Sequence, residues 1–213
     1  MKNPSNTAFI VLAALAGVLA LSGGMFAASH LFAPATLDSE QMGATYLEGG
    51  RAVTDFSLVT HEGQPFNEQD FHGQWNLVFF GFTNCPDICP TTMIDLARVQ
   101  DSVNGKPALR TLFVTVDPDR DTKERLAAYV PAFHDSFTGV TGDLEQIDRL
   151  ARDLGIVHVR HNENGEDDYM VDHGSAVLLI NPDGQLQAIF QAPHRPADMS
   201  RDLQKILDHH AGR

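Results

Sequence analysis

The sequence predicts an α/β domain in which helices cover both faces of a mixed β-sheet. Residues 75–82 and 109–116 are almost entirely apolar, as expected of strands that are buried on both faces. Each of these segments is followed by one with helical spacing of its apolar residues. A hairpin at residues 176–190 and a closing helix at residues 196–210 complete the order βαβαββα. This order describes a mixed sheet with a helical layer on either side.

Local signals place the elements between the second buried strand and the hairpin. A helix is expected from about residue 122, and residues 143–146 have the form of a capping box that opens another helix. Gly155 suits the end of that second helix. Residues 156–171 look like an inserted hairpin about an Asn164-Gly165 turn.

The amino-terminal segment predicts a transmembrane anchor. Residues 8–28 contain no charged residue, and 21 residues in a helix span about 30 Å, the thickness of the hydrocarbon core. Lys2 precedes this run, so the positive-inside rule leaves residues 1–7 in the cytoplasm and exports the rest. We therefore expect a single-pass protein of a bacterial-type inner membrane, with a tether at residues 29–50 and a periplasmic domain at residues 51–213.

A cleaved signal peptide is the competing interpretation of the same segment. Ala33-Pro34-Ala35 has the small-x-small form of a cleavage site. The apolar run is longer than the ~7 to 15 residues typical of a signal peptide, which favours the anchor. Both interpretations place the domain outside the cytoplasm.

The charge of the chain argues against binding to nucleic acid. Asp and Glu number 28 against 15 Lys and Arg, which gives a formal net charge of -13. Binding to phosphates requires clustered basic residues, which an acidic surface does not supply. An acidic surface suits a basic protein partner or a cation, or simply keeps the domain soluble.

The two cysteines, Cys85 and Cys89, lie where the first buried strand meets its helix. Residues four apart share one face of a helix, so both sulfurs can approach one point. A helix amino terminus stabilises the thiolate form of a cysteine. Thiolates are soft ligands that prefer Cu(I), whereas a structural zinc site normally has four protein ligands. Two buried free cysteines or an inert disulfide are the alternatives. The cysteine position and the order of elements together resemble thioredoxin.

Three stretches of sequence, taken in order, resemble the Sco/SenC family of copper proteins over residues 51–210. They are FGFTNCPDICPTTM, TVDPDRDT and DYMVDHGSAVLLINPDG. The resemblance implies a thioredoxin-like fold, an amino-terminal membrane anchor and copper bound by Cys85, Cys89 and His173. It also implies a role in building the CuA centre of cytochrome c oxidase, and some members are suggested to act as thiol reductases.

Other residues near the expected site are assigned from their places in the chain. His173 precedes the strand at residues 176–180, and in thioredoxin-like folds the loop entering that strand lies beside the cysteine loop. Asp117 follows a central strand, so it is either a neighbour of the metal ligands or a partner contact, or else a turn cap. His158 and His161 are expected to be solvated, with a secondary metal site as the alternative.

The function predicted from these features is that of a copper metallochaperone. It would hold Cu(I) or Cu(II) and pass the metal by ligand exchange to the oxidase subunit that carries the CuA site. The alternative is a thiol-disulfide oxidoreductase that keeps the cysteines of a partner reduced. A C-x-x-x-C spacing with a neighbouring His favours copper over redox work. A peroxidase is disfavoured because Thr83-Asn84-Cys85 lacks the arrangement of Pro and Thr expected before a peroxidatic cysteine.

Overall fold

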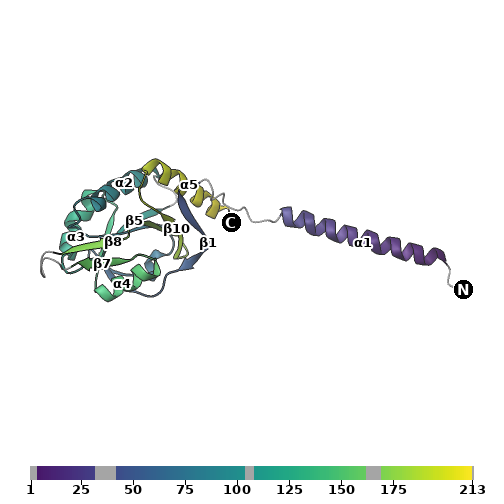
Figure 1. Ribbon diagram of the computed structural model, residues 1–213, viewed down its shortest axis with the longest axis horizontal. Coiled ribbons are helices and arrows are strands. Elements are labelled where there is room, and N and C mark those ends of the chain that lie inside the picture. The colour runs from purple at the N-terminus through teal and green to yellow at the C-terminus, as the bar shows by residue number, and fades with distance from the viewer. Residues whose placement is uncertain (1–3, 32–41, 104–107, 162–168, 213) are drawn as a thin grey trace.

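The computed structural model describes residues 4–31, 42–103, 108–161 and 169–212. Helix α1 (Pro4–Leu31) is followed by an α/β domain built on an eight-stranded sheet of order β1-β10-β9-β4-β5-β6-β2-β3 (Figure 1). The strands of this sheet are β1 (Ala44–Ala52), β2 (Ser57–Thr60), β3 (Pro65–Asn67), β4 (Trp75–Gly81), β5 (Leu109–Thr115), β6 (Thr138–Thr141), β9 (Val177–Ile180) and β10 (Gln185–Phe190). Strands β4, β5 and β6 are parallel and the remaining pairs are antiparallel, so the sheet is mixed as predicted.

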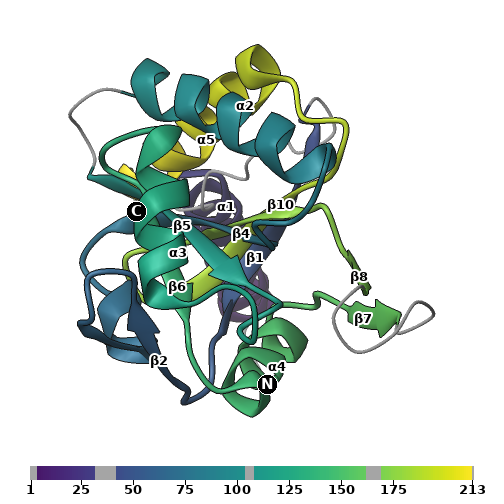
Figure 2. The same cartoon turned by 90° about the vertical axis from the view of Figure 1, so that its left-hand side faces the viewer.

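Helices lie on both faces of this sheet, which confirms the predicted layers. Helices α2 and α5 pack against each other on one face, and α4 lies on the opposite face (Figure 2). Helix α3 contacts the neighbouring strand β6. The bounds of these helices are α2 (Ile88–Ser102), α3 (Lys123–Tyr129), α4 (Leu144–Asp153) and α5 (Pro196–Ala211), with short 3-10 turns η2 (Glu68–Phe71) and η3 (Val130–Ala132).

Strand β4 is the centre of the core. It pairs with β5 on one side and β9 on the other, and every residue from Trp75 to Gly81 is buried. A strand in this position has a helical layer over each face, so an apolar side chain at every position is stabilising. The nearly continuous apolar sequence of residues 75–82 therefore predicted the central strand correctly.

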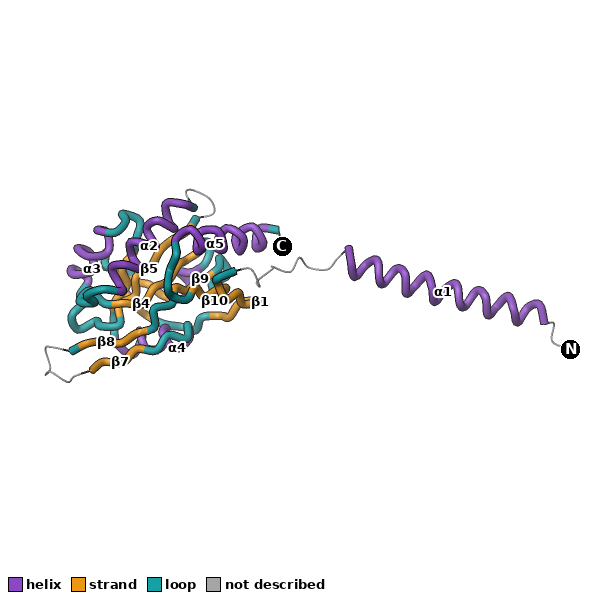
Figure 3. Tube along the Cα trace, turned by 45° about the horizontal axis from the view of Figure 1, so that its top comes forward, coloured by secondary structure: helices purple, strands orange, loops and turns teal. Residues whose placement is uncertain are grey.

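The predicted hairpin between residues 156 and 171 is present, with its strands shifted slightly toward the carboxyl terminus. Strands β7 (His158–His161) and β8 (Met170–His173) pair antiparallel in a sheet of their own, apart from the main sheet (Figure 3). The Asn164-Gly165 turn lies outside the described residues. His173 is the last residue of β8, so this small sheet determines where its imidazole points.

The boundary predicted between tether and domain is wrong. Residues 44–50, assigned to the tether at residues 29–50, form most of β1, which pairs with β10 at the edge of the main sheet. Gly49 and Gly50 have φ angles of 78° and 65°, and the pairing register shifts between Tyr46 and Arg51. The two glycines thus form an irregularity inside a strand, because only glycine adopts such φ angles readily.

The apolar amino-terminal segment is helical and forms most of α1. Over the part of the chain whose placement is described, no helix combines the length and the apolar character needed to cross a membrane. The anchor expected at residues 8–28 stays a prediction. The alternative cleavage site at residues 33–35 lies outside the described residues.

Strand β1 generates a prediction about the folded unit. A fragment that begins at Arg51 loses residues 44–50 and their pairing with β10, whereas a fragment that begins at Met42 keeps them. The shorter fragment should be less stable by at least about 2 kcal/mol, because each backbone hydrogen bond contributes about 1 kcal/mol net. Urea denaturation of both fragments measures this difference. Equal free energies of unfolding would show that β1 adds nothing to the domain.

Candidate metal centre

The two cysteines lie at the carboxyl end of β4 and the start of α2. Cys85 is in the connecting loop and is partly exposed, whereas Cys89, in the first turn of α2, is fully buried. The backbone N–H of Cys89 donates to the Cys85 sulfur over 3.4 Å. Both cysteines are free thiols. The i and i+4 spacing therefore brings the two sulfurs together without a bond between them.

Gly81 provides the space for the buried sulfur. A Cβ atom at this position would lie 2.8 Å from Cε2 of Phe113 and 3.2 Å from Sγ of Cys89. Contacts this short would force a rigid aromatic ring or the sulfur to move. The last residue of β4 thus has to lack a side chain if Cys89 is to point toward the metal site.

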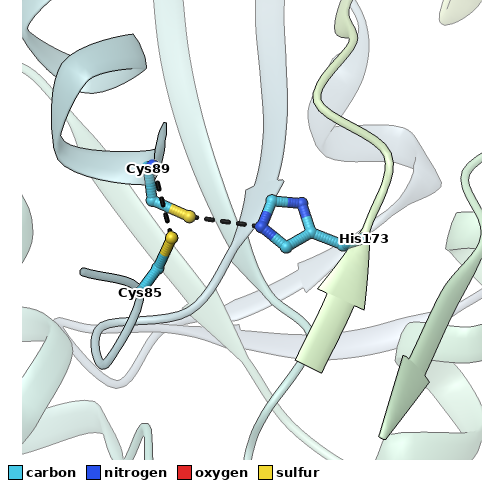
Figure 4. A group of neighbouring side chains, drawn as sticks. All are labelled: Cys85, Cys89 and His173. Carbon is cyan, nitrogen blue, oxygen red and sulfur yellow. Dashed lines mark hydrogen bonds between the residues drawn. The ribbon is translucent and has the colours of Figure 1, made fainter. Parts of the chain in front are cut away.

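His173 completes a cluster with the two sulfurs (Figure 4). Its Nε2 atom lies 3.2 Å from Sγ of Cys89, and its ring meets the rings of Phe79 and Phe82 edge-on at centroid distances of 6.0 and 5.8 Å. Its Nδ1 atom lies 3.0 Å from the carbonyl oxygen of Gly174. A carbonyl only accepts, so we assign the proton of the neutral ring to Nδ1. That tautomer leaves the Nε2 lone pair facing the sulfurs, as a metal ligand requires.

Burial controls the protonation of this cluster. Desolvation, followed by the hydrogen bond to Cys85, raises the pKa of the Cys89 thiol well above its usual range. Desolvation also lowers the pKa of His173 below 6.5, although the hydrogen bond to Gly174 opposes this effect. Without metal, the cluster therefore holds a neutral thiol beside a neutral imidazole. A metal ion that binds here must displace a proton from Cys89.

The donor set fits a soft or borderline metal ion. One ligand atom from each of Cys85, Cys89 and His173 can be chosen so that all lie within 4.8 Å of one another. Metal–ligand distances of about 2.0 to 2.3 Å allow two ligands on opposite sides of an ion to be about 4.6 Å apart. Two sulfurs and one imidazole are one ligand short of a structural zinc site but suit copper. This is the sole such cluster found among the described residues.

A cleft of about 240 Å³ gives access to the cluster. Residues of the cysteine loop and of β8 form its walls, and Ile88 and Met170 at its rim are about half exposed. Its lining residues are Phe82, Cys85, Pro86, Asp87, Ile88, Met170, Val171, Asp172 and His173. Of the two sulfurs, that of Cys85 is the one that a molecule arriving in the cleft can reach, and the partly exposed His173 lines the cleft as well.

Asp117 is fully buried and contacts residues around the site rather than its three ligands. Its carboxylate accepts hydrogen bonds from Arg120, from Arg160 over 3.4 Å and from the hydroxyl of Tyr169 over 2.5 Å. Burial and the hydrogen bond to Asp117 raise the pKa of Tyr169 to about 12. Of the three roles considered for Asp117, a partner contact fits poorly with complete burial.

The two other histidines singled out in the sequence lie outside the cluster. Nε2 of His158 is 2.9 Å from Asp148, and Nε2 of the exposed His161 is 2.8 Å from Asp172. Neither belongs to a metal-binding group among the described residues. Sequence reasoning missed a different contributor, Asp121, whose buried carboxylate binds the loop before Cys85. Its place in the DPDRD run was the available signal.

Comparison with known proteins settles the family. The SCO1/SenC family model matches residues 44–208. The chain belongs to this family. A putative copper-binding protein of Stutzerimonas stutzeri is 37% identical over 171 residues, which are 79% of this chain and 83% of that protein. The mitochondrial SCO1 homolog of Mus musculus is 38% identical over 158 residues, 73% of this chain.

Membership of the SCO1/SenC family confirms the predicted fold. The crystal structure of Arabidopsis thaliana ScoI with copper bound has a TM-score of 0.68 and 30% identity, and the match covers 76% of this chain and 99% of that one. The chain spans just over half, 56%, of the length of the mouse mitochondrial relative. The thioredoxin-like architecture predicted from the order of elements is therefore that of the family.

The unequal burial of the two sulfurs predicts unequal reactivity. In reduced, metal-free protein, iodoacetamide should modify Cys85 first and Cys89 at least about tenfold more slowly, because burial hides the Cys89 sulfur and raises its pKa. Mass spectrometry of peptides taken over time measures both rates. Urea-unfolded protein is the control, in which the two rates should converge. Equal rates in the folded protein would contradict the geometry.

Proposed function

We propose that this chain is a copper metallochaperone that binds copper through Cys85, Cys89 and His173. It delivers the metal to, or prepares, the CuA site of a cytochrome c oxidase subunit. The observation that carries the proposal is the convergence of two sulfurs and one imidazole nitrogen within 4.8 Å. A relative described as a putative copper-binding protein and a family structure with copper bound support the choice of metal.

The arrangement suits a site that takes up copper and gives it away. Two thiolates provide the softness that Cu(I) prefers, and the imidazole adds a nitrogen ligand that Cu(II) accepts. Three ligands leave room for a ligand from a partner protein, which can enter through the cleft beside the partly exposed Cys85. Transfer then proceeds by exchange of ligands, with Cys85 the natural first ligand to be replaced.

Thiol-disulfide exchange fits the same residues less well. Cys85 is open to a partner's sulfur, but exchange also needs Cys89 to attack as a thiolate, and Cys89 is buried and its pKa is raised. His173 at 3.2 Å from the Cys89 sulfur has no required part in such exchange. Copper binding uses all three groups, and so we place it first.

Anchoring in a membrane is a further part of the proposal. Its support is the sequence: residues 8–28 carry no charge, and Lys2 lies on their amino-terminal side. An anchored domain outside the cytoplasm would face oxidase subunits embedded in the same membrane. The shared membrane would confine donor and acceptor to one surface and raise their encounter rate.

Replacement of single ligands should separate the two copper states. Cys85→Ser or Cys89→Ser should weaken Cu(I) binding by more than about 100-fold, since even residues that only support a ligand contribute 10- to 100-fold. His173→Ala should leave weak two-sulfur Cu(I) binding but remove the thiolate-to-Cu(II) absorption band. Titrations with Cu(I), in competition with a chromophoric chelator, and with Cu(II) measure both effects.

His161→Ala is the matched control for the ligand variants. His161 lies on the same hairpin but is exposed and outside the cluster, so this variant should bind both copper states as the wild type does. A wild-type Cu(II) spectrum from His173→Ala would show that the third ligand is misassigned. Wild-type Cu(I) affinity in either Cys→Ser variant would overturn the site itself.

The proposed topology has its own test. A reporter fused after Arg213 should be active when it requires export and inactive when it requires the cytoplasm, because Lys2 is the sole Lys or Arg before Arg51. Adding positive charge after residue 28 by Ser29→Lys and Thr36→Lys should reduce export of the reporter. Activity of a cytoplasm-dependent reporter on the unmodified chain would contradict the proposed orientation.

A further inference from the structure

The segment from Asp117 to Asp121 carries two fully buried carboxylates at its two ends. The backbone N–H of Asp121 donates to the carbonyl of Asp117 over 2.9 Å. The hydroxyl of Thr115 accepts from the N–H of Asp117 over 2.9 Å and donates to Asp121 over 2.7 Å. These bonds hold the two carboxylates in a fixed relation to each other and to the end of β5.

The Asp121 carboxylate holds the loop that leads into Cys85. It accepts from the backbone N–H of Thr83 over 2.9 Å and from the Thr83 hydroxyl over 2.5 Å. Arg125 extends this contact by donating to the Thr83 hydroxyl over 2.5 Å and to the side chain of Asn84. Thr83 is thus bound by the β5–α3 connection, and Asn84 by the first turn of α3.

The Asp117 carboxylate holds the hairpin that carries His173. Tyr169, four residues before His173, donates its hydroxyl to Asp117 over 2.5 Å, and Arg160 of β7 donates over 3.4 Å. Arg120 also donates to Asp117 and to the backbone carbonyl of Tyr169, the latter over 3.0 Å. The hairpin pairs in a sheet of its own and, over its described residues, has no backbone pairing with the main sheet. These side-chain contacts therefore hold it against the domain.

Contacts with aromatic rings connect Asp117 and its partners to the His173 imidazole. The ring of Tyr169 lies 3.8 Å from the guanidinium of Arg120 and 4.3 Å from that of Arg160. The Arg120 guanidinium also lies 5.9 Å from the centroid of the Phe82 ring, which meets the His173 ring edge-on. Asp117 orients Arg120, and Arg120 packs on the aromatic side chain that supports the His173 ring.

We infer that Asp117 and Asp121 are positioning residues that set the two arms of the metal centre independently. Asp121 places the Cys85 end of the cysteine loop, and Asp117 places His173. A buried carboxylate is costly unless several donors satisfy it, and each of these has three or more. Because the carboxylates end one short segment, they hold together Cys85 and His173, which lie far apart in the chain.

Amide hydrogen exchange of full-length, metal-free protein tests the two arms without copper. Asp117→Asn and Tyr169→Phe should speed exchange in residues 169–173 by about tenfold or more, and should leave residues 83–89 unchanged. Asp121→Asn and Thr83→Val should have the reverse effect. Tyr169→Phe and Thr83→Val each remove one hydroxyl and keep the side chain's shape, so they test each arm even if an aspartate variant fails to fold.

Copper binding gives the second readout, which rests on the proposed function. Variants of the Asp117 arm should weaken Cu(II) binding about 10-fold or more and shift the thiolate-to-Cu(II) band, while Cu(I) binding by the sulfurs changes little. Variants of the Asp121 arm should weaken Cu(I) binding by about 10-fold or more. Asp55→Asn, at an exposed carboxylate on the chain before β2, is the control and should match the wild type.

The inference is decided by whether the Asp117 variants and the Asp121 variants affect different segments and different copper states. Equal effects of both pairs of variants on both segments and both copper states would reduce the carboxylates to general stabilisers. Behaviour identical to that of Asp55→Asn would also overturn their positioning role. A wild type that binds no copper would refute the proposed function, while the exchange pattern would still decide whether the arms are set separately.

Discussion

The candidate metal centre depends on the contact between Sγ of Cys89 and Nε2 of His173, at 3.2 Å. It joins the first turn of α2 to the end of a hairpin outside the main sheet. The contact requires a strand that ends without a side chain at Gly81 and two phenylalanine rings that hold the imidazole. The site is thus a product of the whole carboxyl end of the central strands, where open α/β sheets commonly place their ligands.

Burial gives this contact its chemical character. The Cys89 thiol and the His173 imidazole are both neutral without metal, because desolvation raises the pKa of one and lowers the pKa of the other. Burial destabilises a bare thiolate at Cys89, and a soft cation that replaces the thiol proton stabilises that thiolate by binding to it. Cys85 remains partly exposed, so the cluster combines one buried thiol with one that solvent can reach.

The sequence predicted those parts of the molecule whose physical signals are local. Residues 75–82 predicted the buried centre of the sheet, and the Cys85–Cys89 spacing predicted two convergent sulfurs. Strand β1 was not predicted because its residues are mostly exposed, with Ala44 the buried exception, and because Gly49-Gly50 is typical of a linker. The role of Asp121 was not predicted because its partner Thr83 lies 38 positions away in the chain, a separation that no spacing rule reaches.

X-ray absorption at the copper edge tests the central claim most directly. The protein, loaded with one equivalent of Cu(II), should show two sulfur neighbours and at least one imidazole nitrogen, and the imidazole contribution should disappear in His173→Ala. A spectrum with sulfur neighbours alone, or an imidazole signal that survives in His173→Ala, would contradict a site built from Cys85, Cys89 and His173. The first result would leave the site without an imidazole ligand, and the second would assign the third ligand to another histidine.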